Sequence, residues 1–543
     1  GFVIPEVLQS VRAREGSFAI DQGDFATAGS VALELGTSTR GARLGYEVGT
    51  TARHRVLGVY APTGGPTEEL IAVEAMRDDG FGENRGSERV SAVAQTRIAV
   101  AGGWVQPVAF AYAARFGEPG VLPLADHQAE RTAFDAAYSD GDGASQRALF
   151  GVRAGRGAVT AGVWLGWRGL RLDENFTGYL LSPAHGDARV QHHTATSGGA
   201  ELAVRRPVTT ALAVVAGVDG RVDVLGQRED QVDGDGAVWL AGRRLRARTL
   251  GGAARLGVEL RRGGLRVDAG VRGDVLHVRA DDELNDRRGR GTVGAVSPRV
   301  TVAWERGRVG LFAAYGRGVR SPEARAFVTD DGGADTDHSL YTGGAATMTR
   351  SDAAEVGVRV STARVAVSLS AFATLIDRES LFDHVSGTNL ELDGTRRLGG
   401  ELAVTAKPRS WLELRADVTA VDARFDVTGN PVPGAPRLLA QGEAHLSHGP
   451  WRGGVHAVYV GARPLAHGAT GAATAVVDAL VGWQRGAIEL GLQLDNVLGQ
   501  EWFEGEYHFA SRWDRNGPAA PLPKIHYSAG RPFGARLSLT YHL

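Results

Sequence analysis

Residues 536–543 read RLSLTYHL, a stretch in which apolar and polar side chains strictly alternate. The same alternation recurs at 255–260 (RLGVEL), 265–271 (LRVDAGV), 412–418 (LELRADV) and 488–494 (IELGLQL). A period of two is typical of β-strands that have one apolar and one polar face. The pattern continues from about residue 40 to the end of the chain, whereas helical periodicity is scarce. The sequence therefore predicts an all-β fold.

Two kinds of connection separate the predicted strands. Nine are very short and rich in glycine and proline, as tight hairpins require: 101–103, 155–157, 206–208, 262–264, 306–308, 361–363, 407–410, 448–451 and 485–487. Nine others are long, polar and irregular: 117–144, 171–189, 219–242, 278–291, 319–350, 377–395, 426–436, 464–473 and 498–532. Short and long connections alternate strictly, which we expect of a chain that runs up and down with tight turns at one end.

The connections give the number of strands. Nine short turns join eighteen strands, three more precede them near 42–50, 55–62 and 67–77, and 533–543 is the last, so the total is 22. An even number of antiparallel strands with short turns at one end and long loops at the other is typical of a transmembrane β-barrel in an outer membrane, with short periplasmic turns and long extracellular loops. A barrel of this width needs a plug in its lumen.

The alternation also assigns the two faces of the barrel wall. A charged side chain facing lipid at the bilayer midplane costs on the order of 2–4 kcal/mol, so the apolar face should be the outer one. We expect Leu256, Val258, Leu260, Leu537 and Leu539 to face lipid, and Arg255, Glu259, Arg536 and Ser538 to face the lumen. Aromatic residues near strand ends would form interfacial girdles: Trp104, Trp164, Trp167, Trp304, Trp411, Trp451, Trp483 and Tyr459.

The composition excludes several classes of function. The chain has 543 residues, no cysteine and a formal net charge of −2. It therefore has no disulfide and no thiolate metal site, and it lacks the basic excess of a nucleic-acid-binding protein. No apolar run reaches 18 residues, which excludes a transmembrane helix. Residue 1 is glycine with no signal-like segment behind it, so we expect any export signal to have been removed.

No motif indicates catalysis. The closely spaced glycines at 151–158 (GVRAGRGA) and 316–323 (GRGVRSPE) do not lead from a buried strand into a helix, as a nucleotide-binding loop would. The nucleophile elbow of a hydrolase is absent from the sequence. We therefore expect no enzyme activity and no cofactor.

Five stretches resemble one family. Residues 1–36, which contain GDFATAG, resemble the end of the plug domain of TonB-dependent outer-membrane receptors. The other stretches are 315–327 (YGRGVRSPEARAF), 394–404 (GTRRLGGELAV) followed by 408–419 (PRSWLELRADVT), 430–437 (NPVPGAPR) and 492–504 (LQLDNVLGQEWFE). Two features depart from the family: its plug is far longer than 36 residues, and its last residue is usually aromatic rather than a leucine such as Leu543.

The resemblance implies a domain organisation, a location and partners. Residues 1–36 would be the C-terminal remnant of the plug and 37–543 the barrel in the cell outer membrane. The receptor would actively take up a scarce, bulky nutrient, such as a ferric siderophore, cobalamin or a similar metal complex. Its partners would be the TonB energy-transducing complex, outer-membrane lipid, a small-molecule ligand and the missing plug segment, on the same chain or a separate one. Two alternatives remain: a passive outer-membrane porin or channel, and a soluble β-rich binding protein.

Candidate ligand-lining residues follow from charge and position. Arginines at strand–loop junctions could contact the carboxylate or phosphate groups of an anionic ligand, or pair with carboxylates of the barrel. Imidazoles suit copper, nickel or zinc, but adjacent residues on a strand point to opposite faces, so His192 and His193 cannot easily bind one metal. The candidates are Arg168, Asn175, His192, His193, Arg320, Arg396 and Arg397.

The acidic loop 330–338 (DDGGADTDH) offers oxygen ligands for a hard cation such as calcium. It lacks the terminal glutamate of an EF-hand loop, and a solvated loop is the simpler interpretation. The weak candidates for metal ligands are Asp330, Asp335, Asp337 and His338. The sequence predicts no firm metal site.

Overall fold

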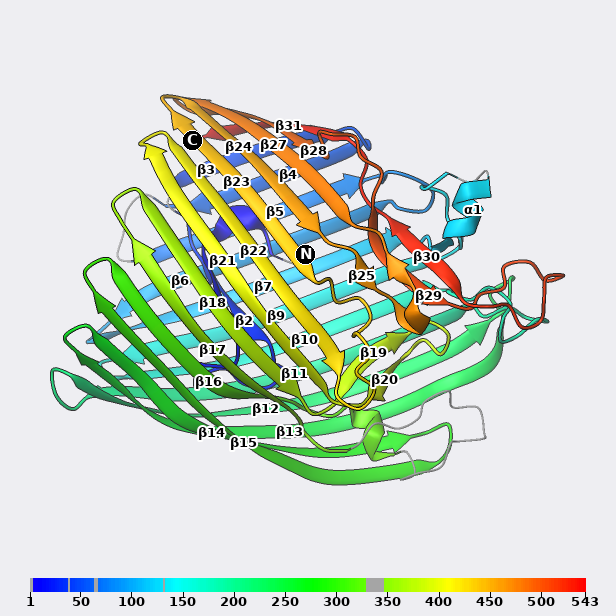
Figure 1. The fold of residues 1–543 in the computed structure, drawn as a ribbon, viewed down its shortest axis with the longest axis horizontal. Helices are drawn as coiled ribbons and strands as arrows, with labels where there is room; N and C mark the ends of the chain where they lie inside the picture. Colours follow the sequence, from blue (N-terminus) through cyan, green and yellow to red (C-terminus); the bar gives the residue numbers. More distant parts are fainter. Residues whose placement is uncertain (1–2, 38–39, 63–66, 130–131, 329–345) are drawn as a thin grey trace.

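One closed antiparallel sheet of 22 strands forms the body of the computed structural model, which describes residues 3–37, 40–62, 67–129, 132–328 and 346–543 (Figure 1). The barrel strands are β3 (Gly41–Gly49), β4 (Arg53–Ala61), β5 (Thr67–Asp78), β6 (Ser87–Val100), β7 (Gly103–Gly117), β9 (Asp142–Arg156), β10 (Val159–Glu174), β11 (Arg189–Pro207), β12 (Leu212–Val232), β13 (Val238–Arg262), β14 (Leu265–Asp282), β15 (Arg287–Arg306), β16 (Val309–Arg320), β17 (Thr349–Ser361), β18 (Val365–Ile376), β21 (Thr395–Arg409), β22 (Leu412–Phe425), β23 (Leu438–His448), β24 (Trp451–Val460), β27 (Thr474–Arg485), β28 (Ile488–Asp495) and β31 (Gly534–His542). Each strand pairs with its neighbours along the chain, and β31 closes the barrel by pairing with both β28 and β3.

The remaining elements lie outside this closed sheet. The N-terminal segment has η1 (Pro5–Val7) and a hairpin of β1 (Leu8–Glu15) and β2 (Gly29–Leu35). The long loops have β8 (Leu122–Pro123), α1 (Leu124–Ala129), η2 (Ala324–Phe327), β19 (Glu379–Asp383), β20 (Thr388–Leu392), β25 (Arg463–Pro464), η3 (Ala466–Gly468), β26 (Thr470–Gly471), β29 (Phe503–Phe509) and β30 (Lys524–Ala529). No helix among these described residues is long and apolar enough to cross a membrane.

The predicted fold and strand number are confirmed, but two predicted loops are wrong. Most of 219–242 and 278–291 is strand, and the true connections are 233–237 and 283–286. The β-ladder continues here although both faces of the sheet are polar; for example, Arg228 lies directly opposite Arg244. Loss of alternation marks the end of the apolar band, whereas backbone hydrogen bonding sets the end of the strand. Short connections therefore also occur at the loop end, and the alternation of short and long is not strict.

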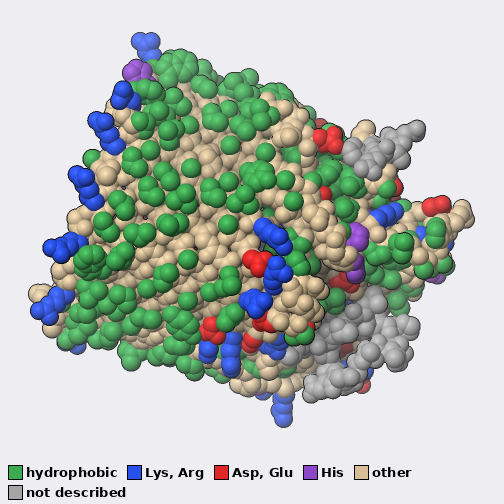
Figure 2. Space-filling model, viewed as in Figure 1, with side chains coloured by type: hydrophobic (Ala, Val, Ile, Leu, Met, Phe, Trp, Pro, Cys, Tyr) green, Lys and Arg blue, Asp and Glu red, His purple; other side chains and the backbone are tan. Residues whose placement is uncertain are grey.

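The two faces of the wall follow the predicted register. Leu256 and Leu537 are 57% and 58% exposed on the outer surface, and Val258 and Leu539 are exposed beside them. Inside, Arg255 pairs with Asp219 at 3.1 Å and Arg536 with Asp495 at 2.8 Å. Figure 2 shows apolar side chains over the middle of the outer face and basic side chains along the edge with the tight turns.

The aromatic girdle is wrong at two of its eight positions. Trp164 lies between Val163 and Leu165, which are both exposed outside, so its ring points into the lumen. Trp104 also points inward, where the Arg97 guanidinium lies 4.4 Å from its ring centroid. Both residues alternate with the apolar, outward-facing residues of their strands. Nearness to a strand end alone therefore does not place an aromatic residue in the outer girdle.

The N-terminal segment lies against the inner wall of the barrel. Ile4 and Val7 pack on a buried apolar patch of β4, β5 and β6 that includes Leu57 and Val59. Further along, the Phe25 amide donates to the Val319 carbonyl at 2.9 Å. This segment therefore contacts the inner wall both near Ile4 and near Phe25, as expected for a segment inside the barrel.

Replacing Leu256 with arginine should destabilise the folded barrel by about 2 kcal/mol, because the new charge would face the apolar outer surface. Gln441→Arg is the matched control, since Gln441 lies on the inner face, 3.3 Å from a carboxylate oxygen of Asp417. Denaturant unfolding in phospholipid vesicles measures both. Equal unfolding free energies for the two variants would contradict the assigned register.

Candidate functional site

The long loops gather at one end of the barrel. Figure 1 shows β19, β20, β25, β29, β30 and α1 at this end, opposite the tight hairpin turns. Arg189, buried at the start of β11, donates to the Ser386 carbonyl at 2.7 Å and so holds the β19–β20 hairpin to the wall. The loops thus fold onto the barrel mouth through contacts between distant parts of the sequence.

A basic cluster lies on the inner wall below this mouth. Arg168 of β10 is exposed in the lumen, directly opposite Arg147 of β9, and the charge of Arg221 of β12 also acts on it. His193 of β11 lies close enough to Arg168 for the two side chains to interact electrostatically. The Arg221 guanidinium lies 5.6 Å from the Trp164 ring centroid. We call these five residues the lumenal basic cluster.

The charge of the cluster is only partly compensated. Asp223 accepts from Arg221 at 2.7 Å and is also bonded to Ser197 and to Thr249. Within the described parts of the chain, Arg168 has no carboxylate within ion-pair distance. A planar guanidinium binds carboxylate or phosphate groups through two parallel hydrogen bonds. The cluster can therefore bind an anionic ligand that enters the lumen.

The structure brings together only Arg168 and His193 of the predicted ligand-lining residues. Arg397 donates to Thr395 at 2.8 Å and pairs with Glu379, so it anchors β19. The Asn175 side chain is buried and accepts from the Gly178 amide at 2.7 Å, which closes a turn of its own loop.

The other predicted residues lie apart from this cluster. His192 faces outward by strand alternation, as Arg396 does beside the exposed Leu398. Arg320 ends β16. Across the described ranges, no group of three or more His, Asp or Glu side chains could hold a metal ion. The weak metal candidates Asp330, Asp335, Asp337 and His338 lie outside the described residues.

Sequence reasoning missed an aromatic cluster that links two loops, 377–394 and 496–533. The His384 ring stacks on Phe509, with centroids 4.9 Å apart, and contacts Tyr507 at 4.3 Å and Phe382 at 5.1 Å. Phe509 in turn stacks on His526 at 3.9 Å. The alternation of Tyr507 and Phe509 in 503–509 (FEGEYHF) was a usable signal for a strand inside a stretch predicted to be irregular.

Burial keeps both histidines of this cluster neutral. Desolvation lowers the pKa of His384 to about 4 and that of His526 to about 3. His526 Nδ1 lies 3.0 Å from the Lys524 carbonyl, which can only accept, so Nδ1 carries the proton. His526 Nε2 then accepts from the Ser511 hydroxyl at 2.7 Å. The neutral ring satisfies both partners.

Acidification should loosen this loop cluster. A solvent-exposed histidine titrates near 6.5, so below that pH the opened loops bind protons that the packed cluster does not. Protection of β29 and β30 against hydrogen exchange should fall as the pH drops from 6.5 to about 4, by up to about tenfold per pH unit for each histidine exposed on opening. His384→Phe keeps an aromatic ring and should remove its share of this dependence. An unchanged pH dependence in His384→Phe would contradict the assigned burial.

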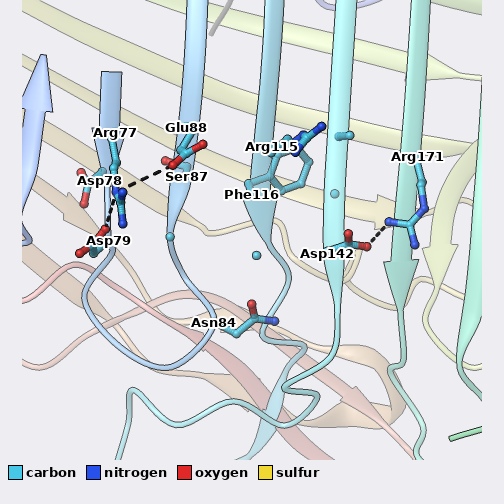
Figure 3. A pocket seen from close by; sticks show the side chains of 14 residues that line it. Arg77, Asp78, Asp79, Asn84, Ser87, Glu88, Arg115, Phe116, Asp142 and Arg171 are labelled. Carbon is cyan, nitrogen blue, oxygen red and sulfur yellow. Dashed lines mark hydrogen bonds and ion pairs between the residues drawn. The ribbon is translucent and has the colours of Figure 1, made fainter. Parts of the chain in front are cut away.

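The pocket in Figure 3 is a feature of the outer rim rather than of the lumen. Its volume is about 540 Å³, and it lies at the loop ends of β5, β6, β7, β9 and β10. Arg77 lies on the same face as the exposed Val73, and it pairs with Glu88 at 3.8 Å; Arg171 pairs with Asp142. These four charged side chains of the pocket lining are therefore already paired with one another.

A closed barrel with an apolar outer band, a polar lumen and elaborated loops at one end is the architecture of an outer-membrane barrel. The family model for the TonB dependent receptor-like β-barrel matches residues 88–497, more than half of the chain. The chain therefore belongs to this family, whose members are receptors and transporters of the outer membrane rather than enzymes.

Solved structures share the fold at low sequence identity. The siderophore receptor PiuA from Acinetobacter baumannii has a TM-score of 0.77 and 12% identity over 99% of this chain and 87% of that chain. The ferric citrate transporter FecA has a TM-score of 0.79 and 12% identity over 100% and 85%. The ferric yersiniabactin uptake receptor FyuA from Yersinia pestis has 0.77 and 13% over 99% and 85%. No curated protein matches the sequence. At these identities the similarity shows the fold alone.

Proposed function

We propose that this chain is the barrel of a receptor that actively takes up a bulky anionic metal complex, such as a ferric siderophore, across the outer membrane. The lumenal basic cluster is the observation that carries the proposal. Arg168 is exposed in the lumen, has no carboxylate partner in the described chain, and has Arg147 and Arg221 beside it. A ferric complex with carboxylate or catecholate groups would supply the anionic partner that Arg168 lacks in the described chain.

The fold supports uptake of a large ligand. A barrel of 22 strands is wider than its own side chains can fill, so passage is controlled by what lies inside it. We propose that residues 1–36 are the end of a plug domain and that 37–543 are the barrel. Ligand would bind to the loops and the lumenal basic cluster. The TonB complex would then supply the energy to displace the plug and open a path.

Three proteins of similar structure act on siderophores or ferric complexes. PiuA is described as a siderophore receptor, FecA as a ferric citrate transporter and FyuA as a ferric yersiniabactin uptake receptor. These ligands are those of the similar proteins. They support a ferric complex here because the lumenal basic cluster supplies the charge that such an anion requires.

Trp164 provides a reporter inside the cluster, because its ring lies beside Arg221. Titration of the purified protein with ferric citrate, a ferric catecholate and uncharged glucose oligomers should quench tryptophan fluorescence only with an anionic iron complex. Trp164→Phe should lose most of the quenching while retaining binding by equilibrium dialysis. Saturable binding of the oligosaccharide with no binding of either iron complex would overturn the proposed ligand class.

A further inference from the structure

Three arginines form a row across the outer face of β13, β14 and β15. Arg248 of β13 lies directly opposite Arg279 of β14 in the sheet, and Arg279 lies directly opposite Arg290 of β15. All three side chains are exposed. We call these residues the arginine row.

The arginine row faces outward, away from the lumen. Arg248 shares its strand face with Leu250, which is 57% exposed, and Arg290 shares its face with Val296, which is 60% exposed. The intervening residues point inward: Ala247 and Val278 are buried in a cluster beside η2. The row is therefore on the surface that continues into the apolar band.

Like charges directly opposite one another destabilise a β-sheet. In the described chain no carboxylate lies within ion-pair distance of Arg248, Arg279 or Arg290. The next row toward the loops is compensated, since Arg246 pairs with Glu283 at 3.1 Å and Arg288 with Asp281 at 3.5 Å. The outer rim in Figure 3 likewise pairs Arg77 with Glu88 and Arg171 with Asp142. The uncompensated row thus differs from the charged positions around it.

The position of the row along the strands matches a lipid headgroup. On β14 the outer face changes from Val275, which is apolar and 50% exposed, to His277, bonded to Thr292 at 2.8 Å, and then to Arg279. On the loop side, Arg248 therefore lies about 6.6 Å of strand beyond the exposed Leu250, and Arg279 lies about 13 Å beyond Val275. A surface cavity of about 780 Å³ extends from Arg248 and Arg279 toward the loops, where both basic and acidic side chains line it, among them Arg246, Arg288, Asp281 and Glu283.

We propose that the arginine row binds the phosphate groups of a phosphorylated lipid in the outer leaflet, whose acyl chains lie on the apolar band below. Guanidinium groups bind phosphate through paired hydrogen bonds, and the bound anion would relieve the repulsion along the row. A lipid fits better than free phosphate because the row continues directly into the apolar surface. This inference depends on the outward face of the barrel and is independent of the ligand proposed for the lumen.

Native mass spectrometry of the detergent-solubilised chain tests the proposal with a hexa-acylated glycolipid that carries two phosphates. The variant Arg248→Gln/Arg279→Gln/Arg290→Gln should bind this lipid at least tenfold more weakly than the parent chain. The control variant Arg262→Gln/Arg266→Gln/Arg306→Gln removes the same charge at the tight-turn end of the same three strands. It should bind the lipid as the parent chain does.

Three outcomes would overturn the proposal. The two triple variants could bind the lipid equally. The dephosphorylated glycolipid could bind the parent chain as tightly as the phosphorylated one, which would leave only acyl contact. Inorganic phosphate at millimolar concentration could bind the row as well as the lipid does, which would make it a free-anion site. Circular dichroism of both variants excludes misfolding as the cause of weaker binding.

Discussion

Replacing Arg299 with alanine is expected to release residues 16–27 from the inner wall of the barrel. The guanidinium of Arg299 is buried, donates to the carbonyls of Ala19 and Gln22, the latter at 2.7 Å, and donates to the Arg317 carbonyl at 3.2 Å. Only the two hydrogen bonds to Ala19 and Gln22 hold this segment, and a hydrogen bond that involves a charged group contributes about 1.5–3 kcal/mol. The substitution should therefore cost the docked segment about 3 kcal/mol.

Cysteine labelling can measure this release because the natural chain has no cysteine. Ser17 belongs to this segment and is fully buried, and Ser17→Cys is nearly isosteric. In that background, Arg299→Ala should raise the rate of maleimide labelling about 100-fold, the equivalent of about 3 kcal/mol. Arg306→Ala, at an exposed tight turn, is the control. Equal labelling rates in the two variants would contradict the anchoring role of Arg299.

The double variant Arg168→Glu/Arg221→Glu should weaken binding of an anionic ferric complex by about 1000-fold or more. Each charge-assisted hydrogen bond contributes about 1.5–3 kcal/mol, and the reversed charges add repulsion. Ferric citrate or a ferric catecholate serves as the probe, and equilibrium dialysis gives the affinity.

The control for this variant is Arg156→Glu/Arg306→Glu, which makes the same change in net charge at the tight-turn end of the barrel. It should retain most of the affinity. If both double variants lose affinity equally, the effect arises from net charge alone. The lumenal basic cluster would then have no special role in binding.

The sequence was sufficient for the barrel and its register because both depend on local patterns. Alternation marks each strand, and glycine-rich turns mark nine hairpins. That the Arg255 side chain faces the lumen follows from the alternation of side chains alone. Strand length at the loop end could not be predicted, because both faces there are hydrated and alternation disappears while the backbone ladder continues to Val232 and Val238.

Only those residues of the candidate site could be predicted whose place follows from side-chain alternation along two neighbouring strands. Arg168 and His193 share the inner face of adjacent strands, so they lie together. Arg397 carried the same signal, but its partner Glu379 lies in a separate hairpin. The stacking of His384 on Phe509 joins loops more than 100 residues apart, and no local pattern indicates which loops fold onto one another.

An energised receptor and a passive pore differ in whether uptake of the ligand depends on the energy of the cell. Accumulation of radiolabelled ferric citrate or a ferric catecholate in cells that express the full receptor, with and without a protonophore, tests this dependence most directly. We expect saturable accumulation that the protonophore abolishes and that Arg168→Glu/Arg221→Glu reduces to background. Uptake that rises linearly with external concentration and is unaffected by the protonophore would contradict this expectation, and would identify a passive channel.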